Sequence, residues 1–237
     1  MLLINDDAIK VMKAQHELGV KVDLIVTDPP FRCISGGRND SLSAQKYNSP
    51  SGVLTKNDGK IFDYNDIEFE QWVPLAYSLL KDDSDFYCIT NLLNLFKLKE
   101  VADSAGFKLH NLLVWEKPNS CTPNKWYMKN AEFILYFYKG KARIINDAGS
   151  KMVHQFKNPV GNKLHPTEKP VELMELYVRN SSNPGDVVLD PFMGVGTTGI
   201  ACKRLQRDFI GIEIDKKYYD IAKERLGETT TKLKVKL

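Results

Sequence analysis

The residues best suited to chemistry in this chain form a tetrapeptide, Asp28-Pro29-Pro30-Phe31, at the end of an apolar run over 22–27. The two prolines have no N–H and fix φ at about −65°, so the carbonyl oxygens beside them are left as free acceptors. An ionised Asp28 also accepts hydrogen bonds and donates none, while Phe31 offers a flat face on which a nucleobase could stack for roughly 1 to 3 kcal/mol. The tetrapeptide therefore favours a site for the exocyclic amine of a base. By itself it is equally typical of a turn that ends a strand.

A glycine loop lies far downstream, where an apolar strand expected at 186–189 runs into the segment 190–199. Gly194 and Gly196 permit a tight turn and a close approach of the backbone to a ligand. A helix expected from about residue 197 to residue 205 would present its N-terminal amides to whatever fills the loop. A cofactor site is expected there.

The class of cofactor follows from three further features. Glu213 ends a strand expected at 207–213, about 20 residues beyond the glycines, which is the offset at which an acid receives ribose hydroxyls. The loop lacks the Gly-Lys-Ser/Thr ending that a triphosphate requires. Asp190, at the mouth of the loop, would repel a pyrophosphate but accept hydrogen bonds from an α-ammonium group. These features favour S-adenosylmethionine over NAD.

On these motifs the chain resembles the amino-methyltransferases of DNA, in their circularly permuted β group, over nearly its whole length. In that family a D/S/N-P-P-Y/F/W tetrapeptide holds the target amine, D-P-F-x-G-x-G-T-T binds the methionine part of the cofactor, and H-P-T-E-K-P is a further signature, intact here at 165–170. Thr167 and Lys169 of that signature would help to hold the methionine end. The expected catalytic residues are Asp28, Pro29, Pro30 and Phe31, and the expected cofactor-binding residues are Asp7, Thr167, Lys169, Asp190, Phe192, Gly194, Gly196, Thr197 and Glu213.

The resemblance implies transfer of a methyl group from S-adenosylmethionine to N6 of adenine in DNA. An aspartate in the first position of the tetrapeptide leans toward adenine in the family, and N4 of cytosine is the alternative. An RNA or protein-glutamine methyltransferase is opposed by the intact 165–170 signature and by the permuted order of motifs. A nucleic-acid-binding protein with a vestigial cofactor site is opposed by the intact Asp28, Phe31 and Glu213.

The fold that must position these residues is expected to be α/β: a Rossmann-like, doubly wound, mixed seven-stranded sheet with an antiparallel terminal hairpin, in the circularly permuted methyltransferase order. The hairpin is expected because no clear helix joins the strands predicted at 112–115 and 132–138. If the strand at 187–190 lies beside the strand at 22–27, the glycine loop and Asp28 meet at the carboxyl ends of parallel strands, where such sheets bind ligands.

Length and composition fit one domain over 1–237, with DNA-contacting insertions expected at about 32–65 and 118–165. The net charge of +3 and the 27% of charged residues neither prove nor exclude nucleic-acid binding. The local signal for nucleic-acid binding is a set of basic residues close to aromatic ones. The set consists of Lys125, Lys129, Lys139, Lys141 and Arg143, together with the aromatic Trp126. The expected partner is DNA, duplex or single-stranded, and a homodimer is left open.

The apolar runs are far shorter than the roughly 18 residues of a membrane span, and the acidic start at 5–7 argues against a secretory signal. We therefore expect a soluble protein of a bacterial cytoplasm, encoded by a prokaryote or a phage, with no membrane partner. The four cysteines are scattered without C-x-x-C spacing, which favours reduced thiols and no bound metal; they are Cys33, Cys88, Cys121 and Cys202.

Overall fold

The computed structural model describes residues 1–30, 67–119, 127, 130–159, 161, 164–165 and 167–227. The chain divides into two compact units, one made of Met1–Pro29 with Phe69–Leu237 and the other of Pro30–Glu68. Every helix and strand with described bounds belongs to the first unit. The insertion predicted at 32–65, and Phe31 beside it, lie outside the described residues. The single domain over 1–237 stays a prediction.

One mixed sheet carries the fold. Its strands are β1 (Leu2–Ile4), β2 (Val22–Thr27), β3 (Leu80–Thr90), β4 (Lys108–Glu116), β5 (Ala131–Lys139), β6 (Val153–Gln155), β7 (Val187–Asp190) and β8 (Asp208–Ile212). Their order across the sheet is β1-β8-β7-β2-β3-β5-β4-β6. All neighbours pair in parallel except β3 with β5 and β5 with β4, which are antiparallel.

The predicted number of strands was wrong, because the described residues alone form a sheet of eight strands and not seven. The antiparallel pairing of the strands predicted at 112–115 and 132–138 is confirmed, but this hairpin does not end the sheet, since β6 pairs with the outer side of β4. Only His154 is buried among the three residues of β6. A strand this short gives no readable alternation of polar and apolar residues, so its pairing is set by tertiary contacts such as the 2.8 Å hydrogen bond from Trp115 Nε1 to the Phe156 carbonyl.

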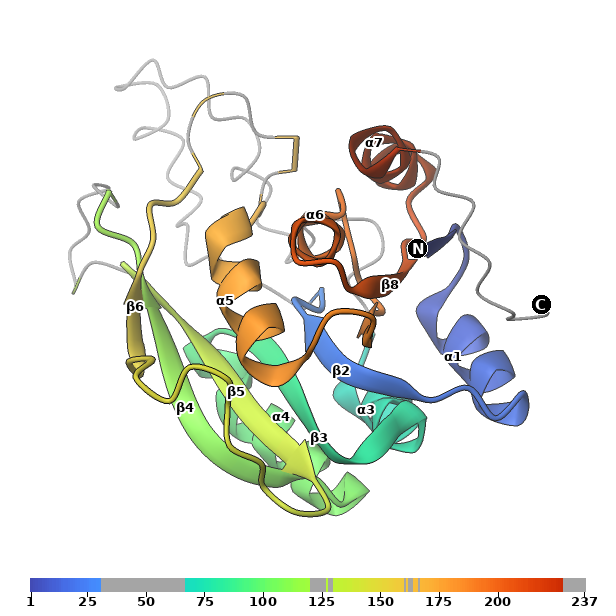
Figure 1. Cartoon of the computed structure of the whole chain (residues 1–237), viewed down its shortest axis with the longest axis horizontal. Coiled ribbons are helices and arrows are strands. Elements are labelled where there is room, and N and C mark those ends of the chain that lie inside the picture. The colour runs from blue at the N-terminus through green and yellow to red at the C-terminus, as the bar shows by residue number, and fades with distance from the viewer. Residues whose placement is uncertain are drawn as a thin grey trace, which may run out of the picture. The chain divides into compact units, whose positions relative to one another are not determined.

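Helices cover both faces of the sheet. Contacts between neighbouring helices group α1 (Ala8–Glu17), α3 (Phe69–Leu79) and α4 (Leu92–Ala105) on one face, and α5 (Val171–Ser181), α6 (Thr197–Arg204) and α7 (Lys216–Leu226) on the other, as Figure 1 shows. In the part of the chain with described structure, no helix is long and apolar enough to cross a membrane.

The two strands that carry the motifs lie side by side, which meets the condition for Asp28 and the glycine loop to share one edge. Leu24 of β2 pairs with Val188 of β7, and Ile25 pairs with Leu189, in parallel. All four side chains are fully buried, which explains why both strands are nearly continuous apolar runs. Because the strands are parallel, the residue after β2 and the glycine loop after β7 lie at the same edge of the sheet.

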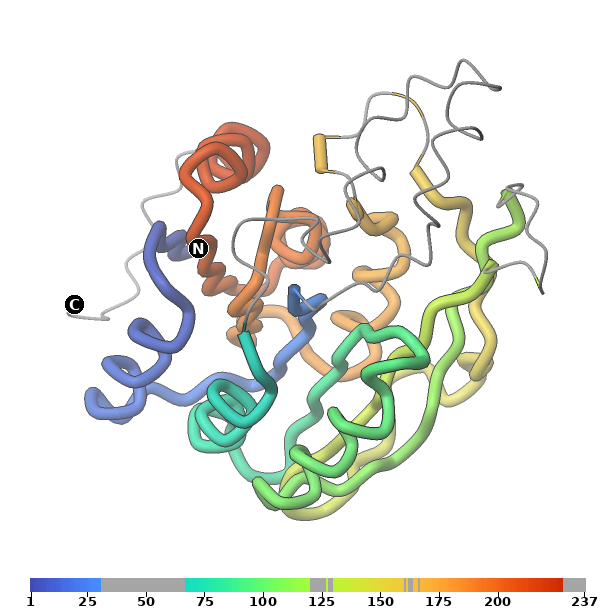
Figure 2. The backbone as a smooth tube through the Cα atoms, turned by 180° about the vertical axis from the view of Figure 1, so that it is seen from behind, coloured from blue at the N-terminus to red at the C-terminus, as the bar shows by residue number. Residues whose placement is uncertain are grey.

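The first strand lies beside one of the last. Leu2 pairs with Ile210 and Ile4 with Ile212, and the Glu213 amide donates to the Ile4 carbonyl at 3.0 Å. Figures 1 and 2 show the N-terminal strand against β8 from opposite sides. This pairing brings the segment after β1 to the edge of the sheet that carries Glu213.

A buried carboxyl of β3 gives a prediction about stability. Asp85 has no exposed surface, and the groups beside its carboxylate that favour the charged form are the Ser181 and Tyr136 hydroxyls, Arg143 and His110, whose effect is smaller than that of burial. Burial raises its pKa above the ordinary 3.8. Below about pH 4 the Asp85 carboxyl is protonated in both the folded and the unfolded protein, so it does not destabilise the fold. As the pH rises through the raised pKa, the folded protein must bury a charge and its free energy of unfolding falls.

We expect Asp85→Asn to raise the melting temperature at pH 8 more than at pH 4, because the amide has no charge to bury. Thermal unfolding at the two pH values checks this, with Asp103→Asn, which changes an exposed carboxylate of α4, as the control. An equal change at both pH values would contradict the assignment of a buried, unfavourable charge to Asp85.

Candidate active site at the carboxyl edge of the sheet

Asp28 follows β2 and is held by one of its two oxygens. Lys169 Nζ donates to Asp28 Oδ2 at 2.6 Å, and the side chains of Lys169 and Asp28 are only 8% and 21% exposed. The other oxygen, Oδ1, is buried and has no hydrogen-bond partner within the described structure. Buried acceptors in native proteins nearly always have a partner, so Oδ1 marks a place where a donor from a ligand would bind.

Of the other three residues of the tetrapeptide, the structure describes the two prolines. Pro29 is buried and Pro30 is half-buried. Phe31, the predicted stacking residue, lies outside the described residues. The structure therefore shows the acceptor oxygen of Asp28 at the end of β2, while the stacking role of Phe31 stays a prediction.

Asp190, at the end of β7, connects three elements. Its Oδ1 accepts from Thr27 Oγ1 at 2.7 Å and from the Phe192 amide at 3.1 Å, and its Oδ2 accepts from Thr198 Oγ1 at 2.7 Å. The carboxyl is 3% exposed, and burial raises its pKa to about 6. The observed partners of Asp190 thus belong to the protein and tie the end of β2 to the glycine loop and α6. Its predicted contact with an α-ammonium group stays a prediction.

The glycine loop turns through two left-handed residues. Gly194 has φ +52° and Gly196 has φ +81°, conformations that favour glycine. A Cβ added at Gly194 would meet no heavy atom within 4 Å among the residues that the structure describes, whereas one at Gly196 would lie 3.1 Å from Ala222 Cβ. Gly196 therefore permits close packing against α7, and Gly194 borders open space.

The helix after the loop begins without a side-chain cap. Gly196 is the N-cap of α6, and it makes no side-chain hydrogen bond to the first amides of the helix. Thr197, the first residue of the helix, is buried. The uncapped amides agree with the predicted ligand-binding role of this turn.

Glu213 lies directly beside the glycine loop. Its Oε2 accepts from the Gly194 amide at 3.0 Å, and its Oε1 accepts from the Asp215 amide at 2.8 Å. Burial raises the pKa of this carboxyl to about 7. A carboxylate has about four lone-pair positions, so each oxygen can still accept from a second donor.

The 165–170 segment connects the two halves of the site. Thr167 Oγ1 lies 3.1 Å from His165 Nδ1, and Lys169 reaches Asp28. Glu168 binds the Arg225 guanidinium of α7 at 3.0 Å, and Arg225 also donates to the Val195 carbonyl of the glycine loop at 2.8 Å. The observed position of Lys169 is beside Asp28. Its predicted contact with the methionine end of the cofactor stays a prediction.

Three residues of this arrangement were missed in the sequence. Thr27 anchors Asp190, Arg225 anchors the glycine loop, and Glu132, at the start of β5, approaches Lys169 Nζ to 3.4 Å. A hydroxyl directly before Asp28 in an apolar strand was a usable signal for Thr27. Arg225 looks like any basic residue in the last turn of a helix, and Glu132 like any charged residue at the start of a strand.

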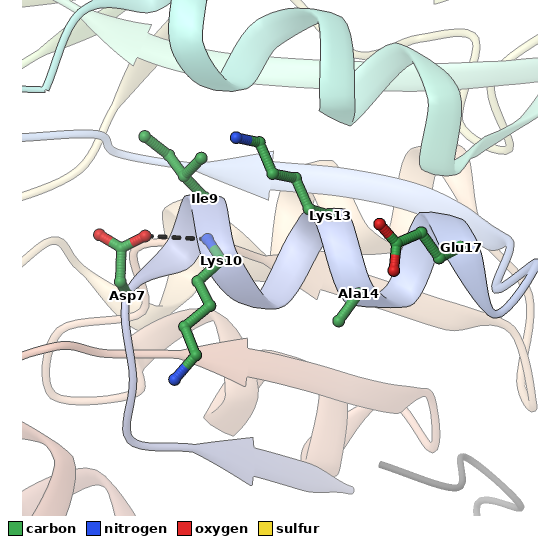
Figure 3. A pocket seen from close by; sticks show the side chains of 6 residues that line it. All are labelled: Asp7, Ile9, Lys10, Lys13, Ala14 and Glu17. Carbon is green, nitrogen blue, oxygen red and sulfur yellow. Dashed lines mark hydrogen bonds between the residues drawn. The ribbon is translucent and has the colours of Figure 1, made fainter.

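Asp7 caps α1. Its Oδ1 accepts from the Lys10 amide at 2.8 Å, which Figure 3 shows as a dashed line. An open hollow of about 430 Å³ next to it is lined by side chains of this one helix: Asp7, Ile9, Lys10, Lys13, Ala14 and Glu17. These side chains point in different directions in Figure 3, so the hollow lacks the converging polar groups of a binding site. The cofactor contact predicted for Asp7 stays a prediction.

A second hollow, of about 590 Å³, borders the site between residues 155–159 and 168–172. Lys169 is part of its lining. Within the described ranges no three histidine, cysteine or acidic side chains are grouped as metal ligands. Cys88 and Cys202 are buried free thiols, and Cys33 and Cys121 lie outside those ranges.

Known proteins with similar sequences are DNA methylases and type II methyltransferases. A family model described as DNA methylase matches residues 22–224. The chain is 32% identical over 252 residues to the type II methyltransferase M2.DpnII of Streptococcus pneumoniae, covering 95% of this chain and 89% of that protein. It is 30% identical to the type II methyltransferase M2.MboI of Moraxella bovis, covering 90% of this chain and 83% of that protein.

Solved structures agree in fold. The crystal structure of an M1.HpyAVI–SAM complex superposes with a TM-score of 0.73 at 29% identity, covering 95% of this chain and 98% of that chain. The PvuII DNA methyltransferase, described as cytosine-N4-specific, gives a TM-score of 0.69 at 18% identity, covering 97% of this chain and 87% of that chain. The second likeness concerns the fold alone.

The bond between Thr27 and Asp190 gives the prediction of this section. Thr27→Val keeps the shape of the side chain and removes one of the donors to a buried carboxyl. We expect the free energy of unfolding to fall by about 1 to 3 kcal/mol. Urea denaturation checks the value, and Thr167→Val, which alters a half-buried hydroxyl that makes no contact with Asp190, is the control. Unchanged stability would mean that Asp190 does not depend on this donor.

Proposed function

This chain belongs to the DNA methylase family and is an S-adenosylmethionine-dependent DNA methyltransferase, and on that premise we propose that it methylates N6 of adenine. The observation that carries the proposal is Asp28, whose Oδ2 is held by Lys169 while its buried Oδ1 is left as an acceptor. An adenine amine offers the two hydrogens that such an acceptor and a neighbouring carbonyl would bind.

The residues of the glycine loop fit the cofactor. Open space borders Gly194, the first amides of α6 have no side-chain cap, and Glu213 accepts from the loop at its edge. We assign the ribose hydroxyls to Glu213 and the methionine end to the loop and to the 165–170 segment. The cofactor contacts proposed are Asp7, Thr167, Lys169, Asp190, Phe192, Gly194, Gly196, Thr197 and Glu213.

The chemistry begins with an amine whose lone pair is delocalised into the ring. Asp28 Oδ1 and the carbonyl of a proline in the tetrapeptide accept the two amine hydrogens, which favours a pyramidal nitrogen and turns its lone pair toward the methyl donor. S-adenosylmethionine supplies a methyl group on a positively charged sulfur. The nitrogen lone pair forms the N–C bond as the C–S pair passes to sulfur, and the nitrogen then releases a proton. Alignment and electrostatic stabilisation of the charge that develops on nitrogen supply most of the acceleration.

The target must leave the DNA stack to reach Asp28, at a cost of a few kcal/mol in a duplex. Phe31 would stack on the flipped base. We propose that the segments at 32–65 and 118–165 contact DNA; Lys157, beside the second hollow, belongs to the later one. N4 of cytosine presents a similar amine to the same acceptor, so it is the alternative target.

The experiment that tests the proposal is transfer of labelled methyl from S-adenosylmethionine to duplex DNA, single-stranded DNA and RNA, followed by mass analysis of the nucleosides. N6-methyladenine in DNA is the expected product. N4-methylcytosine would correct the base and keep the site, and methyl transfer to RNA alone would overturn the assignment of DNA as the substrate.

The role of Asp28 gives a direct prediction. Asp28→Ala removes the acceptor for the amine, so methyl transfer should fall by roughly 100- to 1,000-fold, the range seen when one preorganised partner of the reacting group is lost. Affinity for S-adenosylmethionine should be retained, because Asp28 is assigned to the target base. Single-turnover kinetics and calorimetry measure the two quantities. The control is Asp220→Ala, which removes an exposed carboxylate of α7. An active Asp28→Ala enzyme would exclude this residue from the reaction.

Glu213 should make cofactor binding depend on pH. Its pKa of about 7 means that the free protein carries a protonated carboxyl below neutrality, which accepts ribose hydroxyls less well. We expect the affinity for S-adenosylmethionine to fall as the pH drops through 7 toward 6. Glu213→Gln should weaken binding at pH 8 by about 1 to 3 kcal/mol and remove this dependence. Calorimetric titration at several pH values checks both, and unchanged affinity would refute the ribose assignment.

A further inference from the structure

Glu132 is brought to the active edge by the antiparallel strand of the sheet. β5 runs opposite to β3, with Ile134 opposite Ile89 and Phe133 opposite Thr90. The amino end of β5 therefore lies beside the carboxyl ends of β2 and β3. Glu132 is the second residue of β5, so its carboxylate reaches the edge that carries Asp28.

Glu132 belongs to a chain of four alternating charges. Lys169 Nζ lies 2.6 Å from Asp28 Oδ2 and 3.4 Å from Glu132 Oε2, and Lys117 Nζ lies 2.8 Å from Glu132 Oε1. The two carboxylates and two ammonium groups have no net charge when all are ionised. A buried ion without its partner is strongly unfavourable, so each member depends on its neighbours.

Lys169 Nζ has three polar partners. It donates to Asp28 Oδ2 at 2.6 Å and to the Thr167 carbonyl at 3.2 Å, and it forms an ion pair with Glu132 Oε2 at 3.4 Å. An ammonium group has three donors and no more. The ammonium group is thus directed toward these partners and not toward Asp28 Oδ1, which is the oxygen without a partner within the described structure. If Glu132 lost its charge, the third proton would be able to turn toward Oδ1.

The charge of Glu132 also acts on Asp28 through space. Burial raises the pKa of Asp28, Lys169 lowers it, Glu132 raises it, and Lys117 lowers it. Two further groups interact with Asp28 from the neighbouring strands, the Asp190 carboxyl and the buried Cys88 thiol. A carboxylate of higher basicity is a stronger acceptor for an amine hydrogen.

We propose that Glu132 is a positioning residue for methyl transfer: it holds Lys169 away from Asp28 Oδ1 and so keeps that oxygen available to the target amine. This inference rests on the proposed function, because it concerns how Asp28 receives its substrate. It assigns a task to a residue that contacts neither the cofactor loop nor the tetrapeptide directly.

The test is Glu132→Gln, which keeps the size of the side chain and removes its charge. We expect kcat to fall by roughly 10- to 100-fold, by analogy with residues that orient the ligands of a metal ion. The dissociation constant of S-adenosylmethionine should not change. The acid limb of the pH profile of kcat should move to lower pH, because loss of the neighbouring anion lowers the pKa of Asp28.

A matched control lies on the adjacent strand. Glu116 of β4 accepts from Gln155 Nε2 at 2.8 Å and takes no part in the chain of charges. Glu116→Gln should therefore keep the wild-type kcat and the wild-type acid limb. If Glu132→Gln does not fold, Glu132→Asp is the second variant, because its shorter carboxylate withdraws from Lys169 and should still lower kcat with cofactor affinity unchanged.

A double-mutant cycle separates positioning from general stabilisation. If Glu132 acts through Asp28, then Glu132→Gln should have little effect on the residual kcat in an Asp28→Asn background. Additive losses would overturn the inference, as would a wild-type kcat and acid limb in Glu132→Gln. Failure of the proposed function is distinct, because it would appear in the wild-type protein itself, as an absence of methyl transfer to DNA.

Discussion

The ion pair between Lys169 and Asp28 is the contact on which the candidate site depends. It joins residues 141 positions apart in sequence, at the ends of two segments that carry recognisable motifs. Both side chains are largely buried, so removal of either would leave a buried charge without its partner, at a cost of about 3 to 5 kcal/mol. The pair is also central to the proposed chemistry, since it occupies one oxygen of Asp28 and leaves the other without a partner among the described residues.

The sheet makes this contact possible in two ways. Parallel pairing of β2 with β7 places Asp28 beside the glycine loop, and Asp190 fixes the distance between them by binding Thr27 and Thr198. Antiparallel pairing of β5 then delivers the start of a strand to the same edge, which is how Glu132 approaches Lys169. A sheet with parallel strands alone would have placed that carboxylate at the opposite edge.

The sequence predicted much of this arrangement, because the motifs are local and the apolar strands are buried on both faces. It predicted parallel strands ending at Asp28 and at the glycine loop, which share one edge if β7 lies beside β2, and the structure shows this pairing. It also assigned Glu213 to the same cofactor site as the loop by its spacing, and the structure places Glu213 next to the loop. It did not predict β6, because three residues are too few to show a readable alternation of polar and apolar side chains. It therefore predicted seven strands, whereas the described residues form eight. The contact of Glu132 with Lys169 and the contacts of Arg225 were missed for the same reason. Both are set by where distant segments meet, which no local pattern encodes.

The most direct test of the account is a crystal structure with S-adenosylhomocysteine and a short DNA that presents one unpaired adenine. We predict that the adenine amine lies within 3.2 Å of Asp28 Oδ1 while Oδ2 stays on Lys169, a distance typical of an N–H···O hydrogen bond. The account would be contradicted by an amine bound elsewhere, or by a Lys169 that has left Asp28 for the carboxylate of the cofactor. Either result would mean that Oδ2 does not hold Lys169 while Oδ1 accepts from the target amine.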